Sequence, residues 1–89
     1  MNEGDIEIRG IVSLRNDPNN SNKLYVILTC TLDQKILEKI HLNFNEEFYI
    51  KVSNLKTYSI YADFKGVKSR VFNIQKAQKT VFLSLNINN

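Results

Sequence analysis

The sequence predicts an all-β domain, a seven-stranded antiparallel β-sandwich, with a small open barrel as the alternative architecture. Strand-forming residues dominate the composition, since isoleucine occurs 10 times and valine 6 times, whereas alanine, the best helix former, occurs twice. Apolar and polar residues alternate along most of the chain, which is the period of a strand with one buried face. Turn-forming clusters recur roughly every 8–12 residues, the usual spacing in small β-sandwiches.

The length and composition favour one domain over residues 1–89, with an ordered core from about 5 to 87. A hydrophobic content of 43% excludes a disordered tail, and no apolar run reaches the ~18 residues of a membrane-spanning helix. Met1 is followed by polar and acidic residues rather than by a signal peptide. If Met1 is the natural start, we expect a cytoplasmic protein; an excised domain would belong to the cell envelope or the extracellular space.

The first half of the chain predicts two strands separated by a polar loop. Asp5–Leu14 alternates, with its even-numbered residues on the buried face. The loop over Arg15–Asn22 contains Pro18, the only proline of the chain. Leu24–Thr31 is apolar on both faces, which is typical of a strand at the centre of a sheet.

The segment Thr31–Ile40 fits either a short helix or a strand, because its apolar residues satisfy both periods. The alternation continues beyond the span of a short helix, which favours the strand. An odd-numbered loop over Leu32–Gln34 would pair Val26 with Ile40 and bring the apolar faces together. We therefore expect either this odd-numbered loop or two strands in different sheets, with Glu38 near an edge or a bulge.

The second half of the chain reads as strands joined by turns. Lys65-Gly66 is a turn signal. Tyr58 shares the apolar face of its strand, so we expect it in the core with its hydroxyl bonded to backbone, whereas Tyr61 faces solvent. The predicted strands are Phe48–Val52, Tyr58–Phe64, Ser69–Ile74 and Val81–Ile87.

The order of short motifs adds a family resemblance. A G-x-V motif stands in the first strand at Gly10–Val12, and a turn feeds an F-x-I strand over Asn45–Ile50. A leucine precedes a tyrosine-led strand over Leu55–Ala62, and a glycine-centred hairpin follows at Phe64–Ser69. This order resembles a carboxypeptidase regulatory-like domain of the transthyretin-like (prealbumin-like) sandwich group. The resemblance implies a non-catalytic accessory or adhesive module; an immunoglobulin-like sandwich and an OB-like barrel stay open as alternatives.

The counts of reactive residues argue against enzyme chemistry. A single cysteine excludes an intrachain disulfide or a multi-thiolate metal site, and a single histidine excludes a histidine-rich metal cage. Cys30 and His41 fall on opposite faces, so we expect Cys30 to be a core thiol rather than a nucleophile. The three glycines are too scattered to cradle a phosphate. We therefore expect no enzymatic activity, no bound metal and no cofactor.

Charge asymmetry is the feature that points to a partner. Residues 1–50 carry a formal charge of −3, and residues 51–89 carry +6. This basic half predicts contact with an acidic protein or another anionic partner. Lysine outnumbers arginine there, which favours a protein over nucleic acid. The candidate binding residues are Lys51, Lys56, Tyr61, Lys65, Lys68 and Arg70.

Three other interpretations compete with this one. A single-strand nucleic-acid binder on a barrel scaffold would use the same cations together with exposed aromatic rings. A small inhibitor or regulator of a larger enzyme is a second possibility. The third is a solvated lysine surface that only keeps strand edges from pairing. The sequence predicts neither the partner's identity nor the oligomeric state.

Overall fold

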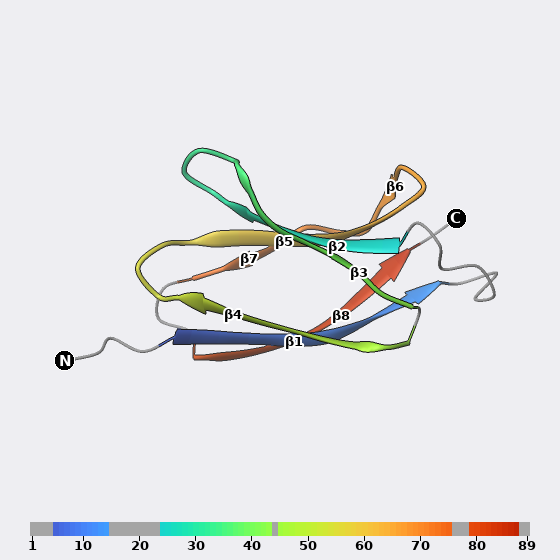
Figure 1. Ribbon diagram of the computed structural model, residues 1–89, viewed down its shortest axis with the longest axis horizontal. Coiled ribbons are helices and arrows are strands. Elements are labelled where there is room, and N and C mark those ends of the chain that lie inside the picture. Colours follow the sequence, from blue (N-terminus) through green and yellow to red (C-terminus); the bar gives the residue numbers. More distant parts are fainter. Residues whose placement is uncertain (1–4, 15–23, 44, 76–78, 88–89) are drawn as a thin grey trace.

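The computed structural model describes residues 5–14, 24–43, 45–75 and 79–87, and these form two β-sheets packed face to face (Figure 1). The predicted all-β sandwich is confirmed, and the two sheets do not close into a barrel. The predicted loop over Arg15–Asn22 lies outside the described residues. The strands are β1 (Asp5–Leu14), β2 (Leu24–Cys30), β3 (Ile36–His41), β4 (Glu47–Ser53), β5 (Tyr58–Phe64), β6 (Val67–Lys68), β7 (Phe72–Ile74) and β8 (Thr80–Ile87).

The smaller sheet has the strand order β4-β1-β8. Strand β1 is antiparallel to β4 but parallel to β8, so the first and last described strands lie side by side in the same direction (Figure 1). Ile8 lies opposite Ile50 on one side and Val81 on the other. The purely antiparallel arrangement predicted from the sequence is therefore wrong for this pair. The chain passes through the other sheet before it returns, as a parallel pairing requires.

The larger sheet has the order β3-β2-β5-β6, and β7 also pairs with β5. Strand β2 is central, as predicted. The segment Thr31–Ile40 begins with a turn and then contributes residues 36–40 to β3, so the favoured strand is confirmed over the helix. Val26 lies opposite Ile40 in the predicted register. The register then shifts between Leu28 and Thr29, where Leu28 lies opposite Glu38. The prediction of an edge or bulge at Glu38 is thus confirmed.

The predicted strand Ser69–Ile74 is wrong, because β6 and β7 are separate strands. Ser69 is buried, and its hydroxyl accepts a hydrogen bond from the Ala62 N–H at 2.9 Å. The same hydroxyl donates to the Arg70 carbonyl at 3.0 Å. A side chain thus takes the place of a main-chain acceptor, and the ladder is interrupted. The described residues therefore form eight strands, whereas the sequence predicts seven.

The core lies between the inner faces of the two sheets. Strand β8 alternates buried and exposed residues along its length, and Leu85 is fully buried. Cys30 is 3% exposed, which confirms the predicted burial of its thiol. Tyr58 is equally buried, and its hydroxyl donates to the Ser53 carbonyl at 2.6 Å, as predicted. Because core side chains fill the space between the inner faces, we look for a binding site on the outer faces and at the sheet edges.

Candidate functional site

The six candidate residues lie in separate parts of the sandwich. Lys51 lies on β4 in the smaller sheet, where it forms an ion pair with Asp5. Lys56 lies between β4 and β5 and lines a pocket of about 270 Å³ with Leu32 and Leu55. The other four lie on or beside strands β5 and β6: Tyr61, Lys65, Lys68 and Arg70.

The ion pairs of the described residues distinguish Lys51 from the other candidate cations. They are Arg9–Glu7 at 3.8 Å and Lys51–Asp5 at 3.7 Å, and both lie on the smaller sheet. Asp63 is the only acid of residues 51–89. Its carboxylate accepts the Gly66 N–H at 3.0 Å, and it forms no ion pair with Lys68, which lies opposite it in the ladder. The cations beside β5 and β6 therefore have no acidic partner within the described part of the chain.

A group of cations and aromatic rings covers the outer face of the larger sheet. Side chains alternate between the two faces along β2 and β5. Val26 and Ala62 point into the core, so the residues next to each of them along its own strand point outward. The register places Ile27 opposite both Lys39 and Tyr61. We call this surface the cation–aromatic face; it comprises Tyr25, Lys39, His41, Tyr61 and Lys68. The half-buried Asp63 also lies on it, opposite both Tyr25 and Lys68.

The side chains of this face contact one another in pairs. Lys39 Nζ lies 4.6 Å from the centre of the Tyr25 ring, and Lys68 Nζ lies 5.3 Å from that of Tyr61. The rings of Tyr25 and His41 meet edge to face, with their centres 5.4 Å apart. Beneath them Ile27 is only 5% exposed although it points away from the core. Rings and lysine stems thus form a second apolar layer whose charged groups remain at the surface.

The turn between β5 and β6 brings Lys68 onto this face. Lys65 and Gly66 have φ angles of 53° and 88°, the two positive values of a type I′ hairpin turn. The return strand then sets Lys68 opposite Asp63, next to Tyr61. The turn predicted from Lys65-Gly66 is therefore present and positions the second cation–ring pair.

The arrangement suits carboxylates better than nucleic-acid bases. A lysine ammonium over a tyrosine ring keeps its full charge and can bind a carboxylate directly. Base stacking needs an open ring face, whereas Lys39 already lies over Tyr25 and Lys68 over Tyr61. A nucleic acid would first have to displace both lysines.

Three residues of this face were missed by the sequence analysis. Tyr25, Lys39 and His41 belong to the half of the chain with the negative formal charge, so a search for a basic half passes over them. The signal lay in the register, because pairing Val26 with Ile40 also sets Tyr25 opposite His41. Charge counted along the sequence does not report which strands become neighbours.

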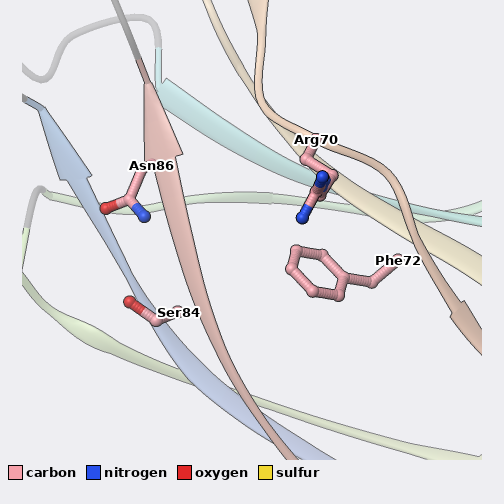
Figure 2. A pocket seen from close by; sticks show the side chains of 4 residues that line it. All are labelled: Arg70, Phe72, Ser84 and Asn86. Carbon is pink, nitrogen blue, oxygen red and sulfur yellow. The ribbon is translucent and has the colours of Figure 1, made fainter.

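Arg70 faces a different part of the molecule. A pocket of about 360 Å³ lies between the segment that holds Arg70 and Phe72 and the outer residues Ser84 and Asn86 of β8. Figure 2 shows the Arg70 and Phe72 side chains extending into this space, with β8 across from them. Arg70 is therefore not part of the cation–aromatic face.

Other kinds of site find little support in the described residues. They contain no group of three or more His, Cys, Asp or Glu side chains placed to hold a metal, and no helix long and apolar enough to cross a membrane. His41 lies opposite Tyr25, which is five positions from Cys30 along β2, so Cys30 and His41 do not lie opposite each other. Comparison with protein-family models and with curated proteins finds no match for the chain.

Proposed function

We propose that this domain is a non-catalytic binding module that contacts an acidic protein surface through its cation–aromatic face. One observation carries the proposal. Lys39 and Lys68 lie over tyrosine rings on one exposed sheet face, whereas the ion pairs of the described residues lie on the other sheet. The lysines of the larger sheet thus have no ion-pair partner among the described residues.

The physical chemistry of this face favours protein recognition. Tyrosine is enriched at the centres of protein interfaces, where it supplies a large rigid contact area. Lysines beside it attract an acidic partner and raise the rate of association. The tyrosine hydroxyls of Tyr25 and Tyr61 add hydrogen-bond donors for carboxylates.

The resemblance to carboxypeptidase regulatory-like domains favours the same function class, because it implies accessory modules rather than enzymes. An inhibitor or regulator of a larger enzyme would be a narrower form of this proposal. The nucleic-acid alternative is disfavoured by the lysines that cover the tyrosine rings.

Titration with fluorescein-labelled polyglutamate tests the proposal. The Lys39→Glu/Lys68→Glu variant removes the charges over both rings, and we expect it to bind polyglutamate at least about tenfold more weakly than the wild type. The matched control is Lys51→Glu/Lys56→Glu, which changes the net charge equally at two positions outside the face.

The two variants must differ for the proposal to stand. Equal losses of binding would mean that polyglutamate responds to net charge alone. A labelled single-stranded oligonucleotide forms the second arm. Binding of the oligonucleotide more tightly than polyglutamate, with the same two lysines required, would replace the proposal with the nucleic-acid alternative.

A further inference from the structure

Strand β8 lies at one edge of the smaller sheet that the described residues form. It is the last strand in the order β4-β1-β8, and in the described part of the chain it pairs only with β1. Its residues Thr80–Ile87 include no charged side chain and no proline. Natural sheet edges are usually blocked by lysines, prolines or bulges. This edge lacks the first two devices along its full length.

The backbone groups that face outward on β8 follow from its pairing with β1. The Lys79 carbonyl accepts the Glu7 N–H at 2.8 Å, so the backbone of Lys79 faces β1. Backbone groups alternate sides along a strand, so the odd-numbered residues of β8 also face β1. The N–H and C=O groups that point away from the sheet belong to Thr80, Phe82, Ser84 and Asn86.

Two large side chains flank this row of backbone groups. Phe72, partly buried against the core, lines the pocket beside Ser84 and Asn86, and Arg70 lines it from the same segment (Figure 2). On the outer side of the strand, Phe82 is 70% exposed. An extended chain laid along β8 would therefore meet hydrogen-bonding groups, an aromatic ring on each side and one guanidinium.

We propose that the β8 edge binds an extended segment of a partner protein as an added β-strand. In this complex the outward backbone groups of β8 pair with the segment, an apolar side chain of the segment packs on Phe72, and a carboxylate pairs with Arg70. The Arg70 guanidinium has no ion-pair partner among the described residues, and an arginine fork suits a carboxylate.

Charge complementarity selects this occupant over a second copy of the chain. A β8–β8 pairing between two copies would bring an edge without any acidic residue beside Arg70. An acidic segment of a different protein satisfies both the backbone edge and the guanidinium. The inference is independent of the cation–aromatic face, because it uses none of that face's residues: it uses the β8 edge of the smaller sheet together with Arg70 and Phe72.

The probe for this site is a fluorescein-labelled peptide of threonine and valine with one central glutamate. N-methylation of the alternate peptide amides that face β8 removes the donors of the ladder, and we expect it to weaken binding at least about tenfold. N-methylation of the other alternate amides is the matched control. Replacing the glutamate with glutamine, or Arg70→Gln in the protein, should each weaken binding about tenfold.

A variant of the protein tests the same edge. Ser84→Pro deletes one outward N–H without removing a bond to β1, and it should weaken peptide binding at least about tenfold relative to Ser84→Ala. In the amide spectrum, peptide should slow hydrogen exchange at Phe82, Ser84 and Asn86. Equal binding of the two N-methylated peptides overturns the proposal. A dimer of the free chain in which these amides are already protected overturns it as well, because a second copy would then occupy the edge.

Discussion

Gly10 occupies a position in β1 where the sheet leaves no room for a side chain. A Cβ atom there would overlap the Leu83 carbonyl oxygen and would approach the end of the Phe48 ring to 2.9 Å. The obstacle includes backbone, so the smaller sheet itself would have to shift. We expect Gly10→Ala to lower the free energy of unfolding by roughly 1–3 kcal/mol in a urea titration. Unchanged stability would contradict the close packing of β1 between β4 and β8.

Tyr58 links the core to the end of β4. Its hydroxyl donates to the Ser53 carbonyl at 2.6 Å. Burial raises the pKa of this hydroxyl above its ordinary value of 10.0, and the nearby Cys30 thiol raises the pKa further. Tyr58→Phe removes the hydrogen bond, and we expect it to cost roughly 0.5–1.5 kcal/mol at neutral pH.

The raised pKa makes this cost depend on pH. In the unfolded chain Tyr58 ionises near its ordinary pKa of 10.0, whereas in the folded protein it stays neutral to higher pH. Its contribution is therefore complete below the unfolded pKa and is lost as pH rises through the folded pKa. Urea titrations of both proteins at neutral and alkaline pH should show the stability gap shrinking in alkali. A gap that is constant with pH would contradict the burial of the hydroxyl.

At the scale of an element, β2 provides the sharpest contrast between its two faces. Val26 is fully buried in the core, whereas Thr29 is half-buried on the outer face. Val26→Asp would place an unpaired charge in the core, so we expect an unfolded chain by circular dichroism. Thr29→Asp should remain folded, because its carboxylate can reach water. Equal tolerance of both substitutions would sink the assignment of β2 as a central strand with one core face.

The elements predicted correctly are those whose signal is local. Alternation identified β1, β4, β5 and β8, and the Lys65-Gly66 dipeptide identified its turn. The break at Ser69 was missed because a serine hydroxyl replaces a main-chain acceptor only when the neighbouring strand presents an N–H to it, here that of Ala62. That break separates Arg70 from the β6 ladder, and no local sequence pattern predicts the break.

The cation–aromatic face was also only partly predicted, because its residues become neighbours only when the strands pair into a sheet. Charge and alternation predict Tyr61 and Lys68 as candidate binding residues. Neither pattern identifies Lys39 as a neighbour of Tyr61, because the two residues come together only through the two ladders that meet at Ile27. Charge asymmetry along the chain was a partial guide, since Lys51 turned out to be ion-paired with Asp5 on the other sheet.

Across the whole molecule, the two outer faces should differ in their electrostatic behaviour. The smaller sheet holds the ion pairs of the described residues, and its Arg9, which lies over the Tyr49 ring, is ion-paired with Glu7. The larger sheet holds Lys39 and Lys68 over tyrosine rings without an ion pair among the described residues. Binding of polyglutamate should therefore weaken steeply between about 50 and about 200 mM salt, because exposed charges are screened over about a Debye length. Fluorescence anisotropy measures this dependence directly. Binding that does not respond to salt would contradict an electrostatic contact.

A map of amide chemical shifts during titration with polyglutamate locates the contact surface residue by residue. We expect the amides of Tyr25, Lys39, His41, Tyr61 and Lys68 to shift together, while those of the opposite sheet, such as Glu7 and Lys51, stay in place. Shifts that centre on the smaller sheet, or that spread evenly over both sheets, would contradict the assignment of the binding surface to the cation–aromatic face.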